Sequence, residues 1–270
     1  MGREMAKIGE LNKGSYVVYN GEPDHPRAES LKIRKKLAEG FKKGLVTPEG
    51  LSAHGRGEAF DYILGEKTTE QAKKAIKAGA AEILLADEPV FSVNGNVAAL
   101  VPEEIAKINE KGGIQVEVNL FHESEDRKRK IGKYLKEKGV EKVLGTEIEY
   151  LTDISEIQSQ RRKVDERGIK RADTVIIPLE DGDRAKALKK LGKRTITIDL
   201  NPLSRTAKAA DVTIVDNIIR ALPLLTEKID KLCQTPSKKL EKILADFDNK
   251  RNLNLTIQSM LNRLEKLSEN

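Results

Sequence analysis

Two short apolar runs in the second half of the chain each end at Asp and lead into helical sequence, and this repeated pattern limits the fold most. The run that opens residues 196–206 is rich in β-branched side chains, which predicts a buried strand. It stops at Asp199, and Pro202 prevents further sheet pairing. The run in residues 212–218 ends in the same way at Asp216. Strands that alternate with helices in this way predict a parallel α/β sheet.

These strand ends are candidate ligand contacts, because ligands of open parallel α/β sheets bind beyond the carboxyl ends of the strands. Asn201 and Asn217 offer carboxamides for a base or a ribose, and Arg205 offers a guanidinium for phosphate. An adenine nucleotide needs groups of these kinds. The alternative, in which the Asp and Asn residues only form turns after the strands, stays open at this point.

The rest of the chain repeats the alternation of strand and helix. Ile33, Leu37 and Phe41 stand four residues apart and predict the buried stripe of a helix over residues 25–43. Further helices are predicted over 69–79 and 123–138, and further strands over 114–121, 140–144 and 174–179. We therefore expect an α/β fold with a mostly parallel sheet flanked by helices. The expected parts are an N-terminal extension over 1–24, one domain over 25–230 and a helical C-terminal extension over 231–270.

Composition disfavours several classes of protein. The 270 residues carry 49 Lys and Arg against 43 Asp and Glu, and the net charge of +6 is spread along the chain rather than gathered in a nucleic-acid-binding arm. Aromatic residues make up only 4%, so stacking platforms for single strands are scarce. One cysteine permits no intrachain disulfide, and the three histidines lack zinc-ligand spacing. No apolar run approaches membrane-spanning length, and the start does not resemble a signal peptide. We expect a cytoplasmic protein with an anionic small substrate, and neither nucleic acid nor membrane as a partner.

An arginine between two glycines lies at His54-Gly55-Arg56-Gly57, which we expect to form a loop before a helix. Glycine on both sides lets the backbone approach a ligand while Arg56 points at it. The segment is not a Walker loop, because no Gly-Lys-Ser/Thr closes it. It is not the dinucleotide-binding G-x-G-x-x-G either, because the third glycine is missing. A plain helix-entry loop is the alternative.

Other polar residues are weaker candidates. Arg27 and Arg34 are seven residues apart on the first predicted helix and project from nearly one side, where they can hold phosphate or simply be solvated. Asn94, Gly95 and Asn96 lie at a predicted junction between a strand and a helix. Backbone N–H groups at such a junction can meet an anion, and turn chemistry explains these residues equally well.

Acidic residues follow the predicted strand over 174–179. Glu180, Asp181 and Asp183 place three carboxylates at its end, which can bind Mg²⁺ or cap the next helix. The polar segment 146–170 before this strand is the least regular part of the chain. We consider a dimer arm or a lid, with a charged surface loop as the default interpretation.

Six motifs together point to one family. They are HPRAESLKIR, HGRGEAFDY, NGNVAALVPEE, PLEDGD, DLNPLSRTA and TIVDN. In this order and spacing they resemble the archaeal phosphopantothenate synthetase (4-phosphopantoate–β-alanine ligase) family over residues 25–230. The resemblance implies a Rossmann-like ATP-binding ligase domain, a homodimer and a step in coenzyme A biosynthesis. It also implies that ATP activates the carboxylate of (R)-4-phosphopantoate as an acyl-adenylate with release of diphosphate. The amine of β-alanine then displaces AMP and gives 4'-phosphopantothenate.

The resemblance carries over a set of site residues. The expected ATP contacts are Arg34, Arg56, Asp199, Leu200, Asn201, Arg205, Thr206, Asn217 and Ile218. Arg34, Arg56 and Arg205 are also the expected catalytic residues, because fixed cations must offset the repulsion between two anionic ligands. Arg27, His54, Asn94 and Asn96 are expected near the substrate, and Asp181 and Asp183 are the expected Mg²⁺ ligands.

Ligase chemistry of this kind needs no nucleophilic side chain, since the substrate itself attacks ATP, and the chain shows no Ser/Cys–His signature. The alternative is an NAD(P)-dependent dehydrogenase on a Rossmann-type fold. The missing third glycine after His54 argues against it.

Overall fold

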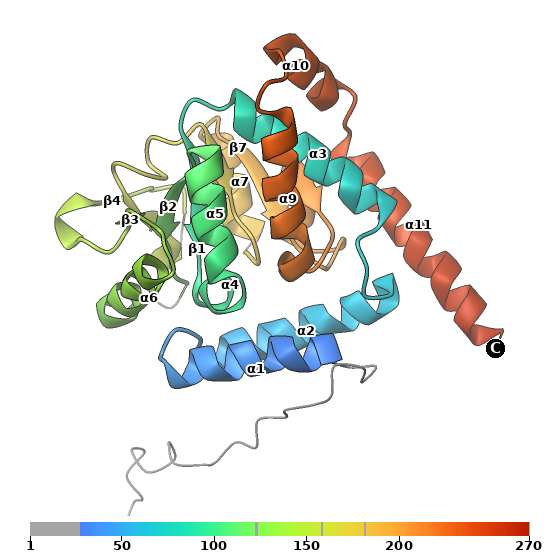
Figure 1. The fold of residues 1–270 in the computed structure, drawn as a ribbon, viewed down its shortest axis with the longest axis horizontal. Coiled ribbons are helices and arrows are strands. Elements are labelled where there is room, and N and C mark those ends of the chain that lie inside the picture. The colour runs from blue at the N-terminus through green and yellow to red at the C-terminus, as the bar shows by residue number, and fades with distance from the viewer. Residues whose placement is uncertain (1–27, 122–123, 158, 181, 270) are drawn as a thin grey trace, which may run out of the picture.

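Six parallel strands form the centre of the molecule. The structure is a computed structural model that describes residues 28–121, 124–157, 159–180 and 182–269. The strands lie in the order β3-β2-β1-β6-β7-β8 (Figure 1). They are β1 (Pro89–Val93), β2 (Gln115–Val118), β3 (Val143–Leu144), β6 (Thr174–Ile176), β7 (Arg194–Ile198) and β8 (Val212–Ile214). The chain adds strands outward from β1 in one direction and from β6 in the other, so the strand order reverses between β1 and β6. The predicted α/β class with a mostly parallel sheet is confirmed.

Helices of the described residues lie on both faces of this sheet, at its edge and beyond the ends of its strands (Figure 1). They are α1 (Ala28–Lys42), α2 (Pro48–Leu64), α3 (Glu70–Leu85), α4 (Gly95–Leu100), α5 (Pro102–Gly112), α6 (Glu125–Glu137), α7 (Gly182–Lys190), α8 (Arg205–Ala209), α9 (Ile218–Leu232), α10 (Ser237–Ala245) and α11 (Asn249–Ser268). Phe91 of β1 joins the core formed with α3, α5 and α9, while the adjacent Val90 packs with α7 and with residues 154–172. Successive strand residues point to opposite faces, so one strand serves both cores.

Residues 54–57 lie inside helix α2, so the prediction of a loop before a helix is wrong here. The hydroxyl of Thr47 accepts the N–H of Gly50 at 3.3 Å, and Pro48 opens the first turn. Gly65 ends the helix in the left-handed conformation, with φ 88°. These end signals and the packing of α2 outweigh the cost of interior glycine, which is about 1 kcal/mol per residue.

The polar segment 146–170 is not a surface loop, which corrects the default interpretation. It contains a two-stranded antiparallel sheet of β4 (Leu151–Asp153) and β5 (Lys163–Asp165), with 3-10 helices η2 (Ile148–Tyr150) and η3 (Gln160–Arg162). Ile154 and Ile169 are buried and belong to the core on the α7 side of the sheet. The four elements are each three residues long, too short for a periodic pattern to reveal them.

A buried carboxylate fastens this segment to the main sheet. Glu117 of β2 is fully buried and accepts the backbone N–H of Asp165 at 3.0 Å and of Ile169 at 2.6 Å. Gly168 leaves room for it, since a Cβ there would lie 2.3 Å from the Glu117 carboxylate. Burial raises the pKa of Glu117 to about 7, against the opposing effect of the two N–H groups and of Arg184.

The C-terminal segment that is predicted to be helical contains two amphipathic helices, α10 and α11. Helix α11 covers the open edge of β8: Asn249 accepts the N–H of Thr213 at 2.8 Å, and Asn252 donates to the Thr213 carbonyl at 3.0 Å. Side chains that pair the backbone of an edge strand block pairing with another chain. No helix of the described residues, the 20-residue α11 included, is long and apolar enough to cross a membrane.

Helix α4 touches the chain after α1 so closely that only glycine fits. A Cβ at Gly95 would lie 2.1 Å from the carbonyl oxygen of Leu45, whereas a Cβ at Gly55 of α2 would meet nothing within 4 Å. We predict that Gly95→Ala lowers the free energy of unfolding by about 1–3 kcal/mol, as overpacking does. Gly55→Ala is the control and should raise it by about 0.5–1 kcal/mol. Urea unfolding measures both variants. If their unfolding midpoints shift in the same direction relative to the wild type, the close contact between Gly95 and the Leu45 carbonyl is contradicted.

The raised pKa of Glu117 predicts a pH-dependent stability. The folded state holds this proton more tightly than the unfolded state, where the pKa is 4.5. The resulting stabilisation is complete below about pH 4.5 and is lost as the pH rises to about 7. Relative to Glu117→Gln, the wild type should lose on the order of 3 kcal/mol between these limits, at about 1.4 kcal/mol per tenfold change in proton affinity. Chemical unfolding across this pH range measures the difference, and a constant difference would show that Glu117 does not titrate there.

Candidate functional site

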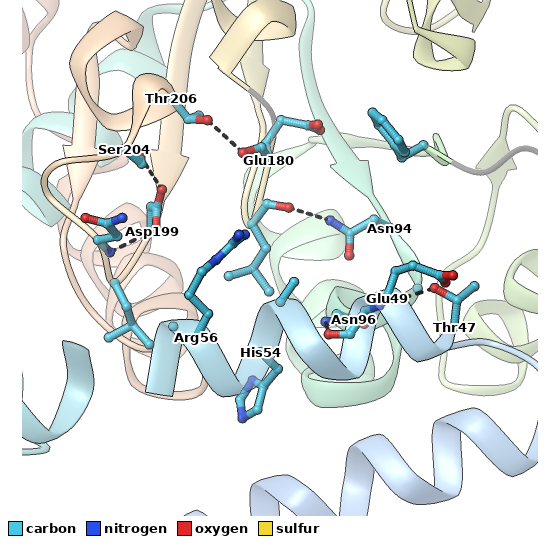
Figure 2. Close-up of a pocket in the computed structure, with 18 of the residues that line it drawn as sticks. Thr47, Glu49, His54, Arg56, Asn94, Asn96, Glu180, Asp199, Ser204 and Thr206 are labelled. Atoms are coloured by element: carbon cyan, nitrogen blue, oxygen red, sulfur yellow. Dashed lines mark hydrogen bonds between the residues drawn. The ribbon is translucent and has the colours of Figure 1, made fainter. Parts of the chain in front are cut away.

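A cavity of about 480 Å³ opens beyond the carboxyl ends of the central strands (Figure 2). Asn94 follows β1, Glu180 comes soon after β6, and Asp199 follows β7, and all three line the cavity. The cavity therefore lies where the strand order reverses, which is the usual ligand position in open α/β sheets. Its size is within the range of pockets that hold small-molecule ligands.

Helix α2 forms one wall of the cavity. Ala53, Arg56, Gly57 and Phe60 have the spacing of one helical face, and all four line the cavity. Figure 2 shows Arg56 pointing into the cavity, while the imidazole of His54 points away from it. Residues two apart on a helix are separated by about 200°, because 3.6 residues make a turn, so these two side chains cannot point the same way. Both residues are among those that line the cavity, and Arg56 is the one whose side chain points into it; a contact of His54 with substrate stays a prediction.

The opposite face of α2 binds α1 through charged groups. Arg34 Nη2 lies 3.0 Å from Glu58 Oε2, and the Tyr62 hydroxyl donates to Glu58 Oε1 at 2.9 Å. The hydrogen bonds that the Arg34 guanidinium donates to the Glu58 carboxylate raise the pKa of Arg34. Burial lowers the pKa of His54, and the charge of Arg34 adds to this effect while Glu58 opposes it. Arg34 is not among the described residues that line the cavity, so its contact with a nucleotide stays a prediction.

The strand end after β7 is held in shape by its own hydrogen bonds. Ser204 Oγ donates to Asp199 Oδ2 at 2.5 Å and accepts the N–H of Ala207 at 2.9 Å, which caps α8. The N–H of Asn201 donates to Asp199 Oδ1 at 2.9 Å. Burial raises the pKa of Asp199, and these bonds and the charge of Arg56 oppose the increase. The expected nucleotide contacts that line the cavity are Arg56, Asp199, Leu200, Asn201, Arg205 and Thr206.

The strand end after β8 lies beside the strand end after β7, because these two strands pair. Its polar side chains bind helices α2 and α9 rather than lining the cavity. Asn217 caps α9 and donates from Nδ2 to Asp61 at 2.8 Å. Arg220 pairs with Asp61 at 2.5 Å and with Asp216 at 2.7 Å. This network holds α2 against α9. Asn217 and Ile218 are not among the described lining residues, so their nucleotide contacts also stay predictions.

The carboxamides of Asn94 and Asn96 bind other parts of the protein. Asn94 caps α4 with Oδ1 and donates from Nδ2 to the carbonyls of Pro178 and Leu179, each at 3.1 Å (Figure 2). Asn96 Nδ2 donates to the carbonyl of Gly50 at 2.8 Å. The predicted junction of strand and helix is confirmed. Both residues line the cavity, and a contact of either with substrate stays a prediction.

The structure describes only part of the remaining candidate set. Arg27 and Asp181 lie outside the described residues. The side chain of Asp183 is 78% exposed and lies 3.9 Å from Arg205, at the start of α7. The part of the chain that the structure describes holds no group of three or more His, Cys, Asp or Glu that could bind a metal ion. Magnesium binding by Asp181 and Asp183 therefore stays a prediction.

Two arginines share one buried carboxylate at the cavity. Arg161 Nη1 lies 2.6 Å from Glu180 Oε2, and Arg184 Nη1 lies 2.5 Å from the same oxygen. Arg184 also donates to the Ser92 hydroxyl at 3.0 Å, and Thr206 Oγ1 donates to the backbone carbonyl of Glu180 at 2.6 Å (Figure 2). The exposed fractions of the Arg161, Glu180 and Arg184 side chains are 7%, 1% and 0%. Glu180 thus joins segments on several sides of the cavity.

The sequence analysis did not single out five polar lining residues. They are Thr47, Glu49, Arg127, Arg161 and Ser204. Ser204 lies inside the DLNPLSRTA motif, so its position between Asp199 and Arg205 was a usable signal. Arg127 lies in a highly charged predicted helix, a pattern typical of a solvent-exposed surface. Arg161 lies in a segment without periodicity. Neither sequence pattern predicts that these side chains line a cavity.

Comparison with known proteins identifies the family of this chain. Residues 71–263 match the model of the phosphopantothenate/pantothenate synthetase family. A 4-phosphopantoate–β-alanine ligase of Thermococcus onnurineus is 48% identical over 246 residues, which covers 91% of this chain and 94% of the relative. The ligase of the same name from Methanosarcina mazei is 44% identical over 91% of this chain and 96% of its own. That of Methanospirillum hungatei is 52% identical over 73% of this chain and 80% of its own. By this similarity over most of its length, the chain belongs to the phosphopantothenate/pantothenate synthetase family.

Proposed function

We propose that this chain is an ATP-dependent ligase that condenses (R)-4-phosphopantoate with β-alanine. The observation that carries the proposal is the identity of 44–52% with relatives named 4-phosphopantoate–β-alanine ligase over most of the chain. The cavity supports the proposal, because it is large enough for small-molecule ligands and its lining can bind anionic groups. Four arginines line it: Arg56, Arg127, Arg161 and Arg205. The dehydrogenase alternative is not supported, since these relatives are ligases and the glycine-flanked Arg56 lies within a helix.

The proposed reaction has two steps. The carboxylate of phosphopantoate attacks the α-phosphorus of ATP, and the bond to the leaving diphosphate breaks. The amine of β-alanine then attacks the acyl carbon of the adenylate, loses a proton, and displaces AMP. Arg56 and Arg205 provide fixed positive charge for these anionic groups. Holding the reactants together can contribute about 7–11 kcal/mol to lowering the barrier. When bound with ATP, Mg²⁺ would add charge neutralisation at the phosphates.

The nucleotide is proposed to occupy the β7 side of the cavity. Asp199 and Asn201 face the cavity beside Arg205 at the start of α8, which is the set that the family resemblance assigns to ATP. We also propose a cytoplasmic homodimer, with residues 25–230 as the ligase domain. The exposed leucines 261, 264 and 267 of α11 support the dimer, because an apolar stripe on a terminal helix is typical of a packing surface. Sedimentation analysis showing a monomer would count against it.

A direct assay tests the activity. Incubation of the full chain with ATP, Mg²⁺, 4-phosphopantoate and β-alanine should yield AMP, diphosphate and 4'-phosphopantothenate. Omission of 4-phosphopantoate is the control and should abolish AMP formation. If no AMP or diphosphate forms under varied conditions of temperature and pH, the proposed function is wrong.

The role of Arg205 has its own test. Arg205→Ala should lower kcat/KM for ATP by about ten- to a hundred-fold, which corresponds to the 1.5–3 kcal/mol of a charge-assisted contact. Lys208→Ala, on the same short helix but outside the cavity lining, is the matched control and should retain wild-type kinetics. If kcat/KM for ATP stays at the wild-type value in both variants, Arg205 does not contact ATP.

A further inference from the structure

Helix α2 is held in place by polar contacts to an unusual degree. It lies across the end of the sheet at which the strands finish, and one of its faces lines the cavity (Figure 1). Only three of its 17 residues are buried, and two of these three are the carboxylates Glu58 and Asp61. Most helices are fixed by an apolar stripe that packs on the core. The position of α2 therefore depends more on its charged groups than is usual.

Polar contacts attach α2 on either side of Arg56. Toward the N-terminal end, Asn96 Nδ2 donates to the Gly50 carbonyl at 2.8 Å. Toward the C-terminal end, Asp61 binds residues at the start of α9. A helix rises 1.5 Å per residue, so Arg56 lies about 9 Å along the axis from the first attachment and about 8 Å from the second. The Arg56 guanidinium can be placed no more firmly than these two attachments allow.

The attachment at Asp61 is directional. Arg220 Nη2 donates to Asp61 Oδ1 at 2.5 Å, and Arg220 Nη1 donates to Asp61 Oδ2 at 3.2 Å. Such a two-pronged pair fixes orientation as well as distance. Asn217 Nδ2 adds a third hydrogen bond to Asp61, at 2.8 Å. The exposed fractions of the Asp61 and Arg220 side chains are 7% and 15%, so little water competes for these bonds.

Arg220 is itself fixed to the end of β8. Its Nη2 and Nε donate to Asp216 Oδ1 at 2.7 Å and 3.0 Å, and Asp216 also accepts the Thr68 hydroxyl at 2.6 Å. Burial lowers the pKa of Arg220, but its bonds to the two carboxylates and their charges outweigh this effect and raise it. β8 pairs with β7, whose end carries Asp199. A chain of contacts thus runs from the strand ends through Arg220 and Asp61 into α2.

We propose that Asp61 and Arg220 are positioning residues for the nucleotide: their ion pair fixes α2 against the end of β8 and thereby sets the place of the Arg56 guanidinium. The inference rests on the proposed function, in which Arg56 supplies positive charge to ATP. Neither Asp61 nor Arg220 is among the described residues that line the cavity, so the pair acts through Arg56. A displacement of about 1 Å caused far from the reacting atoms can cost about a hundred-fold in rate.

Asp61→Asn tests the pair with little change in shape. The buried group holds two carboxylates against one guanidinium, so this variant leaves Arg220 and Asp216 as a balanced pair. The variant should therefore fold, which thermal unfolding checks. Titration calorimetry on the full chain should show the dissociation constant of ATP raised by about ten-fold in Asp61→Asn and in Arg220→Lys. The KM for ATP should rise by the same factor, and the KM for 4-phosphopantoate should change by less than about two-fold.

A double variant separates positioning from general structural damage. If the pair acts by placing Arg56, Arg56→Ala should weaken ATP binding by about ten-fold in the wild type and by less than about three-fold in the Asp61→Asn background. Independent defects would multiply instead. Asp230→Asn is the matched control, because it removes a carboxylate from the other end of α9, where Asp230 pairs with Lys111. It should leave ATP binding unchanged.

Two results would overturn the inference. One is wild-type affinity for ATP in Asp61→Asn, and the other is losses from Asp61→Asn and Arg56→Ala that multiply in the double variant. If Asp61→Asn does not fold, Arg220→Lys and its combination with Arg56→Ala decide in the same way. A wild type that binds ATP but releases no AMP would count against the proposed function, whereas the calorimetry judges the ion pair.

Discussion

The arrangement of the site depends on the ion pairs that the Glu180 carboxylate forms with two arginines. This carboxylate lies between the guanidiniums of Arg161 and Arg184, and all three side chains are almost fully buried. Removing charges from water costs several kcal/mol per ion, so the cluster is stable only because its geometry is close and hydrogen bonds supplement it. The backbone carbonyl of Glu180 meanwhile accepts the Thr206 hydroxyl. One residue therefore links η3, α7 and α8, which carry Arg161, Arg184 and Thr206.

Helix α2 shows what a local pattern can predict and where it fails. The glycines around Arg56 indicated that this side chain faces a ligand, and the structure aims it into the cavity. The same pattern indicated a loop, in which His54 could point the same way. The capped helix sends His54 to the other face, toward Glu58 and Arg34. Thr47 and Gly65, which carried the signals for the helix ends, lie eight or more residues from Arg56.

The strand ends were predictable because their signals are local. Asp199 ends an apolar run, and its carboxylate accepts hydrogen bonds from Asn201 and Ser204, both within five residues. The segment 199–204 therefore contains both of these hydrogen-bond donors. Arg161 was not predictable, because its position depends on partners far along the chain. Glu117 binds the segment at Asp165, 48 residues away, and Asn119 binds Arg161 itself, 42 residues away. Periodicity over a short window contains no information on such contacts.

The basic residues Arg56, Arg127, Arg161 and Arg205 line the cavity, and burial favours arginine at Arg127 and Arg161. No lysine is among the described residues that line the cavity, although the chain is rich in lysine on its surface. A lysine ammonium is strongly hydrated, and its pKa falls readily on burial, so it can lose its charge where charge is required. An arginine keeps its charge under the same conditions, as at Arg127, because burial lowers a pKa that is ordinarily far above neutral. At a buried position of the lining, such as Arg161, an arginine therefore keeps its positive charge more surely than a lysine would. The planar fork of each guanidinium also fixes the orientation of the phosphate or carboxylate that it binds.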